Sequence, residues 1–354
     1  MTESVALGRG GLRVGRYEFG GAPLGGLFER VDDDQSAACL AQAWAAGMRY
    51  FDTAPHYGAG LSERRIGSFL ATKERAEWVL STKVGRLLEP VGEGAAPDDD
   101  FVGEPASTRV FDFSRDGIRR SLDASLQRLG VDRIDIVYLH DPDDHWEQAI
   151  DEGWPALAQW RADGVVTSIG AGMKQAAMLT RFVRETDIDV VLLAGQYTLL
   201  DQEGIIELLP ACTERSTSVV LGGVFNSGVL ANVSASSTFN YGPATAQIVD
   251  RARRLAEVCA RFDVPLAAAA LQFPLAHPAI TTVVIGARSA AEVTQNARLA
   301  ALSLPAEMWS ALRAEGLLPE HVPTPAAVAV RHEPDATETD AVVEPLHPRV
   351  SGAK

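Results

Sequence analysis

Short apolar runs alternate with amphipathic segments along most of the chain, and this alternation constrains the fold more than any other feature. The runs are rich in Val, Ile and Leu and mostly lack polar alternation, so we predict strands that are buried on both faces. The predicted strands are Tyr17–Gly20, Arg49–Thr53, Val79–Lys83, Asp135–His140, Val166–Gly170, Val190–Ala194, Ser218–Leu221 and Thr282–Gly286. Strand–helix alternation of this kind favours parallel strands joined by right-handed crossovers.

The segments between the runs carry helical periodicity with start and stop signals. Ser114 is a predicted N-cap with Asp116 in the first turn, and Gly47 and Gly130 are predicted to end helices. The predicted helices are Ser36–Ala46, Ser62–Leu70, Ser114–Leu129, Gln148–Ala162, Gln175–Glu185, Ile205–Thr213, Thr245–Phe262 and Ala290–Ala300. Eight such units predict an α/β fold, a closed (β/α)₈ TIM barrel rather than an open sheet. The absence of a GxGxxG motif after an early strand also disfavours a doubly wound sheet.

Two segments break the pattern. Residues 87–108 contain six acidic and no basic residues, and we predict a long loop after the third strand, a kind of loop that is usually functional or mobile. Residues 326–354 are rich in Pro, Ala and acidic residues without periodicity, and we predict a disordered tail. The barrel is therefore expected to be one domain over about residues 10–322.

The composition limits the partners and the compartment. A net charge of −15, from 32 basic and 47 acidic residues, argues against nucleic acid or a membrane surface as a partner. Cys39, Cys212 and Cys259 show no CxxC spacing, so neither a disulfide framework nor a metal site is expected. The first residues show no basic region followed by an apolar run, so we expect no signal peptide, and we expect no transmembrane span because no apolar run is long enough to cross a bilayer. We expect a cytoplasmic protein that is a monomer or a small homo-oligomer.

Three consecutive predicted strands each end in an ionisable residue. These are Asp52, Lys83 and His140, and Tyr57 follows shortly after Asp52. Each residue alone has a structural explanation, as a cap, a rim ion pair or a satisfied core histidine. In a barrel, however, these strand ends meet at the face where catalytic groups lie. A phenol has a pKa near 10, so we expect the Lys83 ammonium to lower the pKa of Tyr57.

The other two side chains have matching roles. We expect Asp52 to hold Lys83 as its counter-ion and His140 to donate a hydrogen bond to a substrate oxygen. Tyr57 would then exchange a proton with that oxygen.

The motifs around these residues resemble a known family. FDTAPHYG at 51–58, running into SE at 62–63, STKVG at 81–85 and DIVYLH at 135–140 resemble, in order, the signatures of aldo-keto reductases. The resemblance covers the chain except its tail. It implies a (β/α)₈ barrel, a nicotinamide cofactor bound in extended form, no metal, and a catalytic tetrad of Asp52, Tyr57, Lys83 and His140.

The resemblance also implies a set of cofactor-binding residues. They are Gly21, Ala22, Asp52, Gln196, Gly222, Val224, Asn226, Ser227, Gly228, Gly286, Ala287, Arg288, Glu292 and Asn296. Gln196 matches the family's carboxamide-binding glutamine. The chain departs from the family at Gly172-Met173, where Ser-Asn is common, and at Gly222, where a tyrosine often stacks under the nicotinamide. That stacking contact is either lost or supplied elsewhere.

The choice between NAD and NADP depends on two residues. Members of the family that use NADPH place an arginine four residues before the asparagine that matches Asn296, and this chain has Glu292 there. A carboxylate repels a 2′-phosphate and accepts hydrogen bonds from ribose hydroxyls, which favours NAD. Arg288 lies close enough to bind a phosphate, so NADP stays possible.

Three longer motifs narrow the resemblance to a bacterial branch of sugar and pyridoxal dehydrogenases. They are APLG at 22–25, DTAPHYGAGLSERR at 52–65 and GGVFNSG at 222–228. The branch implies oxidation of the anomeric hydroxyl of an aldose, such as L-fucose, to a lactone with NAD. The alternatives are oxidation of pyridoxal at its 4-position, general reduction of aldehydes and ketones, and a non-catalytic regulatory barrel that binds the cofactor.

The substrate is thus expected to be a small sugar or aldehyde. Sugar hydroxyls need polar partners, and the candidates are His56, Asp141, Asp143, Asp144 and His145, with Trp146 stacking on a sugar face. Residues 143–146 also suit a solvated helix start. A flat pyridoxal ring would need apolar walls, for which the candidates are Phe28, Trp146 and Phe225.

Overall fold

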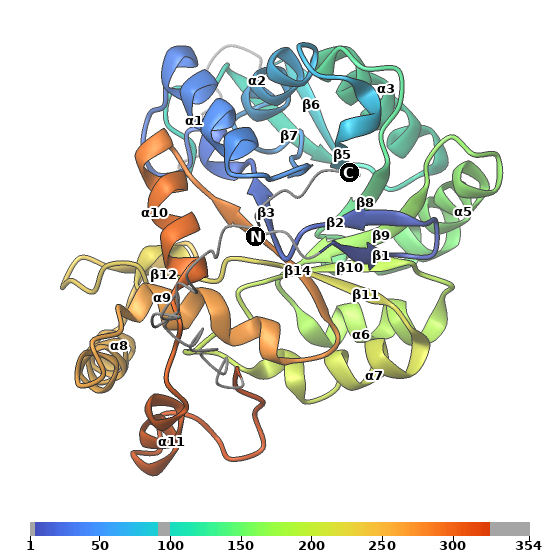
Figure 1. The fold of residues 1–354 in the computed structure, drawn as a ribbon. Helices are drawn as coiled ribbons and strands as arrows, with labels where there is room; N and C mark the ends of the chain where they lie inside the picture. The colour runs from blue at the N-terminus through green and yellow to red at the C-terminus, as the bar shows by residue number, and fades with distance from the viewer. Residues whose placement is uncertain (1–3, 91–99, 326–354) are drawn as a thin grey trace, which may run out of the picture.

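The computed structural model describes residues 4–90 and 100–325, and its centre is a closed barrel of parallel strands (Figure 1). The predicted tail at 326–354 and part of the predicted acidic loop lie outside the described residues. The barrel strands, in order, are β3 (Tyr17–Gly20), β4 (Tyr50–Asp52), β5 (Val79–Val84), β8 (Ile136–His140), β9 (Ser168–Met173), β10 (Val190–Ala194), β11 (Ser218–Gly222) and β14 (Ile280–Gly286). Parallel pairing of β14 with β3 closes the barrel, which confirms the predicted (β/α)₈ fold.

One strand differs clearly from its predicted bounds. β9 begins and ends later than the predicted Val166–Gly170, because the small residues of its second half are part of the strand and not of a turn. A side chain at Gly170 would meet the carbonyl oxygen of Val190 at 2.1 Å, so glycine permits the close approach of β10 there.

Helices surround the barrel (Figure 1). They are α1 (Asp33–Ala45), α2 (Leu61–Leu70), α3 (Arg115–Leu129), α4 (Trp146–Gln148), α5 (Trp154–Ala162), α6 (Ala176–Glu185), α7 (Leu208–Arg215), α8 (Ala246–Ala260), α9 (Leu266–Gln272), α10 (Ala290–Ala301) and α11 (Ala306–Ala314). The predicted cap is confirmed, because the Ser114 hydroxyl accepts a hydrogen bond from the Gly117 N–H at 3.0 Å. Gly130, with φ of 65°, ends α3 as predicted.

The predicted helices differ from the observed ones in several places. A π-helical turn at Ala149–Gly153 separates α4 from α5 within the predicted helix Gln148–Ala162. The sequence analysis did not predict α9 and α11. α9 is an alanine-rich segment with almost all of its residues buried, so it shows no amphipathic period.

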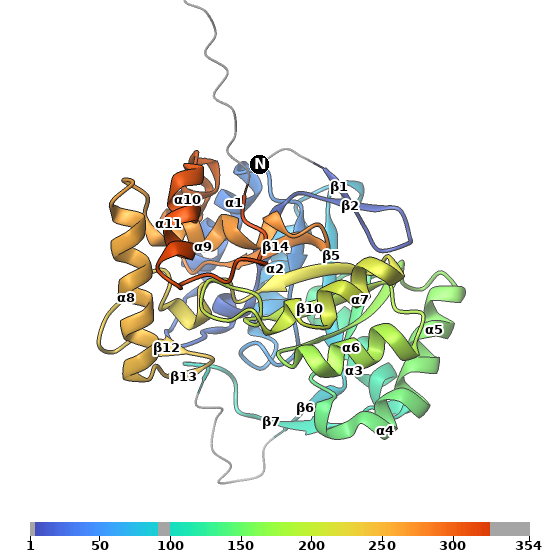
Figure 2. The same cartoon turned by 90° about the horizontal axis from the view of Figure 1, so that it is seen from below.

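Three hairpins lie outside the barrel wall. β1 (Val5–Leu7) pairs with β2 (Leu12–Val14), β6 (Arg86–Pro90) with β7 (Ser107–Phe111), and β12 (Thr238–Phe239) with β13 (Gly242–Pro243). The β6–β7 pairing shows that the two ends of the predicted acidic loop are strands. Figure 2 shows β1–β2 at one end of the barrel, with β6–β7 and β12–β13 at the other end.

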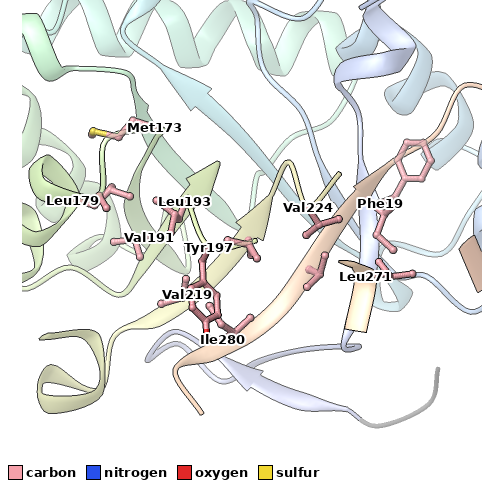
Figure 3. Close-up of a cluster of buried hydrophobic side chains, with 14 of the residues drawn as sticks. Phe19, Met173, Leu179, Val191, Leu193, Tyr197, Val219, Val224, Leu271 and Ile280 are labelled. Carbon is pink, nitrogen blue, oxygen red and sulfur yellow. The ribbon is translucent and has the colours of Figure 1, made fainter. Parts of the chain in front are cut away.

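The strands are buried on both faces, as predicted. On β10, Val191 and Leu193 pack in the layer between strands and helices, part of which Figure 3 shows. Their neighbours Val190 and Leu192 belong to a second cluster inside the barrel. Leu7 and Val14 of the β1–β2 hairpin belong to that second cluster as well. The hairpin therefore closes one end of the barrel.

Two further observations bear on the class of protein. No helix within residues 4–90 and 100–325 is long and apolar enough to cross a membrane. The three cysteines are buried and not bonded to one another, and the described residues contain no cluster of His, Cys, Asp and Glu suited to a metal ion.

The hairpin that closes the barrel predicts a stability effect. Leu7 is fully buried in the interior cluster, so Leu7→Ala should lower the free energy of unfolding by about 2–5 kcal/mol through lost burial and a cavity. The measurement is urea unfolding followed by circular dichroism. Leu302→Ala, at a side chain that is 42% exposed, is the matched control and should change stability little. Equal effects of the two substitutions would contradict the assignment of the hairpin to the core.

Candidate active site

The ends of three neighbouring strands bring the predicted tetrad together at one face of the barrel. Asp52 ends β4, Lys83 lies near the end of β5, and His140 ends β8. Tyr57 follows in the loop between β4 and α2. Gly58 permits the turn of this loop, because its φ is 61° and a side chain there would meet the carbonyl oxygen of Gly25 at 2.1 Å. The barrel register therefore sets the mutual positions of these side chains.

The Lys83 ammonium group makes three hydrogen bonds at the centre of the cluster. Its Nζ donates to Asp52 Oδ2 at 2.8 Å, to Tyr57 Oη at 3.0 Å and to the carbonyl oxygen of Thr53 at 3.0 Å. Lys83 and Asp52 are both buried, with side chains 1% and 4% exposed. The three bonds match the three N–H donors of an ammonium group, so Lys83 is held in one orientation.

A second layer of hydroxyl groups holds Asp52 from inside the barrel. Ser81 Oγ donates to Asp52 Oδ1 at 2.6 Å and lies 2.9 Å from the Tyr50 hydroxyl. The Tyr50 hydroxyl in turn lies 3.2 Å from that of Tyr138. The sequence analysis did not identify these residues, although Ser81 precedes Lys83 by two positions and therefore faces the same side of β5.

Burial and charge act in opposite directions on Tyr57. Burial raises the pKa of Tyr57 above 10, the Lys83 ammonium lowers it, and the Asp52 carboxylate raises it again. The expected net lowering of the Tyr57 pKa is therefore wrong for this structure, because burial outweighs the charge of Lys83. Burial alone would lower the pKa of Lys83, but Asp52 and Tyr57 outweigh it and the Lys83 pKa is raised. At neutral pH, Lys83 is charged and Tyr57 carries its proton.

The His140 ring lies next to the Tyr57 ring. The two rings are 6.0 Å apart between centroids and nearly perpendicular. Burial lowers the pKa of His140 well below 6.5, and the charges of Arg86 and Lys83 lower it further. The imidazole is therefore neutral at pH 7 and has one N–H to donate.

A cavity of about 460 Å³ opens in front of Tyr57, Lys83 and His140. The predicted substrate residues His56, Asp141, Asp143, Asp144 and His145 all line it. The His56 ring is held by Arg109 of β7, whose Nε donates to His56 Nδ1 at 3.0 Å. The cavity thus has a polar wall whose side chains are themselves held in place.

The sequence analysis missed another group of residues that line the cavity. It includes Arg86 and Phe111 of the β6–β7 hairpin, together with Phe101, Met173, Lys174 and Tyr241. The Phe111 ring stacks on that of His145 with centroids 4.9 Å apart. Phe101 lies inside the acidic segment at 87–108, and Phe111 follows shortly after it. Aromatic residues in or next to an acidic segment were the sequence signal that could have identified these lining residues.

The structure does not bring every predicted substrate residue to this cavity. Trp146 is buried in the helical layer, where its ring lies 4.7 Å from that of Phe182 and the Arg181 guanidinium lies 3.8 Å above it. Phe28 and Phe225 line a neighbouring groove. Trp146 follows His145 directly in the sequence. At the start of α4, however, the His145 side chain lines the cavity and the Trp146 side chain packs against Phe182.

Two further cavities, of about 160 and 590 Å³, continue from Tyr57 along the ends of β3, β11 and β14. They share lining residues with each other and with the first cavity, and so form an extended groove. Twelve of the predicted cofactor residues line the groove: Gly21, Ala22, Asp52, Gly222, Val224, Asn226, Ser227, Gly228, Gly286, Arg288, Glu292 and Asn296. A groove with so many glycines, which ends beside Tyr57, fits an extended nicotinamide dinucleotide.

Two predicted cofactor residues lie elsewhere. The Gln196 side-chain oxygen accepts a hydrogen bond at 2.8 Å from the N–H of Ala176, at the start of α6. Ala287 is buried, with its backbone carbonyl near the Cys39 thiol. Tyr241 lines both the first and the second cavity, and it is an aromatic side chain available there in place of the tyrosine missing at Gly222.

Comparisons with known proteins agree with this geometry. Residues 16–315 match the model of the Aldo/keto reductase family. The chain is 46% identical over 325 residues to D-threo-aldose 1-dehydrogenase from Pseudomonas sp, covering 90% of this chain and 98% of the relative. It is 41% identical over 338 residues to pyridoxal 4-dehydrogenase from Microbacterium luteolum, with the same coverage of 90% and 98%. The holo form of an aldo-keto reductase from Bacillus halodurans superposes with a TM-score of 0.71 at 26% identity, covering 93% of this chain and 99% of that structure.

The buried ion pair at the centre of the cluster predicts a double-variant result. Lys83→Met should lower the free energy of unfolding by about 3–5 kcal/mol, because it leaves the Asp52 charge buried without its counter-ion. Adding Asp52→Asn removes that charge and should recover much of the loss. Urea unfolding at pH 7 of the two single variants and the double variant measures both effects. Additive losses would show that the two side chains are not coupled.

Proposed function

Because the chain belongs to the aldo/keto reductase family, we propose that it oxidises the anomeric hydroxyl of an aldose to a lactone with NAD as the hydride acceptor. Family membership makes it an oxidoreductase that uses a nicotinamide cofactor. The observation that carries the proposal is the Lys83–Tyr57 hydrogen bond of 3.0 Å beside His140, at the base of a cavity with a polar wall. We propose the tetrad Asp52, Tyr57, Lys83 and His140 as the catalytic residues.

The proposed mechanism assigns one proton to Tyr57. Its Oη accepts the proton of the C1 hydroxyl, while the C1–H bond breaks and the oxygen–carbon bond becomes a carbonyl. A bound nicotinamide ring supplies the acceptor for the hydride that leaves C1. Lys83 stabilises the phenolate form of Tyr57, and Asp52 fixes Lys83. His140 donates a hydrogen bond to the same substrate oxygen and orients it.

The polar wall of the cavity supports a sugar as substrate. His56, Asp141, Asp143, Asp144 and His145 present hydrogen-bonding groups to the cavity, and a pyranose such as L-fucose has hydroxyl groups on most of its carbons. The name D-threo-aldose 1-dehydrogenase, carried by one relative, agrees with this class. We propose L-fucose as the first aldose to test.

Pyridoxal is a second candidate, because aromatic side chains also line the cavity. Phe101 and Phe111 line the cavity and offer apolar surfaces to a flat ring. Another relative carries the name pyridoxal 4-dehydrogenase. Pyridoxal, like an aldose, can close on its own hydroxyl group to form a cyclic hemiacetal. The same transfer of one proton to Tyr57 and one hydride to the cofactor would convert either compound to a lactone.

The surroundings of Arg288 support NAD over NADP. Its guanidinium lies 2.7 Å from Glu29 Oε2 and 3.4 Å from Glu292 Oε1, and the backbone N–H of Arg288 donates to Glu292 Oε2 at 2.9 Å. Two carboxylates thus offset the one cation available for a 2′-phosphate at this end of the groove. Phosphate recognition favours an uncompensated arginine. We therefore propose that the enzyme prefers NAD.

The first prediction concerns the substrate and Tyr57. With NAD, L-fucose should be oxidised, with NADH formation followed at 340 nm, and the rate should rise from pH 7 to pH 10. The pH effect follows from the raised pKa of Tyr57, because the proton-accepting phenolate is more abundant at higher pH. Tyr57→Phe should lower kcat about 10²- to 10⁴-fold.

Parallel assays distinguish the alternatives. Pyridoxal turned over while every aldose is inert would reject the aldose proposal and retain the mechanism. Activity only with aldehydes and NADH or NADPH would reject the proposed direction. Retention of full activity by Tyr57→Phe would contradict the mechanism itself.

The second prediction concerns the cofactor. Glu292→Arg should raise kcat/KM for NADP relative to NAD by about tenfold or more, because it replaces a repelling carboxylate with a second cation. Arg288→Met should leave the preference nearly unchanged, because Arg288 is already paired with Glu29 and Glu292. Initial rates over a range of cofactor concentrations measure both ratios. A strong preference of the unchanged enzyme for NADP would contradict the proposal.

A further inference from the structure

Arg86 and Asp141 form an ion pair at the edge of the cavity, directly beside His140. Arg86 is the first residue of β6, and Asp141 follows His140 at the end of β8. Their side chains are 15% and 25% exposed, so water screens the pair only in part. The Arg86 guanidinium also lies 4.8 Å above the Phe111 ring of β7, which limits its movement.

The backbone at Asp141 adopts a conformation that is unusual for a residue with a side chain. Its φ is 45°, in the left-handed region, and its N–H donates to the carbonyl oxygen of Gly172 at 3.0 Å. Such a conformation persists where the surrounding structure imposes it. Here it directs the carboxylate back toward its neighbour, with Asp141 Oδ2 only 3.7 Å from His140 Nε2.

A carboxylate at this distance can compete with a substrate for His140. If it approached Nε2 further, it would accept the imidazole N–H and stabilise the protonated ring. The proposed mechanism needs that N–H for the substrate oxygen. Arg86 binds the same Oδ2 atom that lies nearest His140. The ion pair therefore opposes the capture of His140 by Asp141.

We propose that Arg86 is a positioning residue: by binding Asp141, it keeps the carboxylate from His140 and leaves the His140 side chain to bind the substrate oxygen. The proposal rests on the proposed role of His140. It gives the β6–β7 hairpin a part in the chemistry as well as in the cavity wall. Arg86 also adds a positive charge near His140, which agrees with the low pKa of that ring.

Several groups surround His140 and would influence its titration. They are Lys83 on β5, Arg86 on β6, His56 and Tyr57 in the loop after β4, and Asp141 next along the chain. Among these named groups, Asp141 is the one that carries a carboxylate. Removing Arg86 therefore takes away a cation and releases an anion, and both changes raise the pKa of His140. Burial and Lys83 still lower that pKa, so the ring should become protonated at a higher pH than in the unchanged enzyme.

The test uses Arg86→Met alone and together with Asp141→Asn. Arg86→Met should lower kcat/KM about 10- to 100-fold at pH 7, with a smaller loss at higher pH where His140 is neutral again. Adding Asp141→Asn should raise kcat/KM above that of Arg86→Met, because an amide cannot form an ion pair with the imidazole. Arg119→Met, which removes an exposed arginine paired with Asp116 and Asp123, is the control for loss of a charge and should have little effect.

A second readout does not depend on the substrate. Proton–nitrogen NMR spectra of the histidine rings, with His140 assigned from His140→Asn, report its protonation directly. The pH at which the His140 signals titrate should be higher in Arg86→Met than in the unchanged enzyme, and it should fall again once Asp141→Asn is added. If no tested compound is oxidised but the NMR result holds, the proposed function fails and the positioning role stands.

Two results would overturn the proposal. One is an Arg86→Met enzyme whose His140 signals titrate at no higher pH than those of the unchanged enzyme. The other is a double variant that is no more active than Arg86→Met although both are folded by circular dichroism. In that case the hairpin would serve only as a wall.

Discussion

The ammonium group of Lys83 and the carboxylate of Asp52 lie 2.8 Å apart inside the barrel, both removed from water. Burying two charges costs several kcal/mol each unless the geometry is good and the remaining hydrogen-bonding positions are filled. Here the backbone of Thr53 and the hydroxyls of Tyr57 and Ser81 fill them. These partners come from β4, β5 and the loop that follows β4. The pair is therefore tolerated only while the barrel register is intact, and Tyr57 depends on the same register.

The barrel strands and the inserted β6–β7 hairpin supply different residues of the site. The strand ends supply Asp52, Lys83 and His140, which the sequence places at the carboxyl ends of consecutive barrel strands. The hairpin β6–β7, inserted between β5 and α3, supplies Arg86 and Phe111 to the cavity. It also supplies Arg109, which holds the His56 ring. A chain of this kind can change its substrate by changing the hairpin while the strand ends stay the same, because the two parts come from separate segments.

The features that follow from local sequence were predicted, and those that follow from three-dimensional surroundings were not. The strand ends at Asp52, Lys83 and His140 could be located because apolar runs end there. The direction of the shift in the Tyr57 pKa could not be predicted from the sequence, because the burial of the ring depends on the loops that cover it. From their positions in the chain, we expected Trp146 and Gln196 at the site. The Trp146 ring instead packs against Phe182, and the Gln196 side-chain oxygen accepts a hydrogen bond at the start of α6. The β6–β7 pairing joins residues on either side of a long segment, and local periodicity does not report such pairing.

The hydroxyl chain behind Asp52 runs from Ser81 to Tyr50 and Tyr138 and ends inside the barrel. Both tyrosines are fully buried, and the β1–β2 hairpin seals the barrel below them with Leu7 and Val14. Within the described residues, no hydrogen bond continues this hydroxyl chain from Tyr138 to the surface. In the proposed mechanism, a proton taken up by Tyr57 would therefore leave through the mouth of the cavity, by the opening proposed to admit the substrate. In the proposed reaction, the proton and the product would leave through the same opening of the cavity. A change that narrows this opening would therefore slow the release of both.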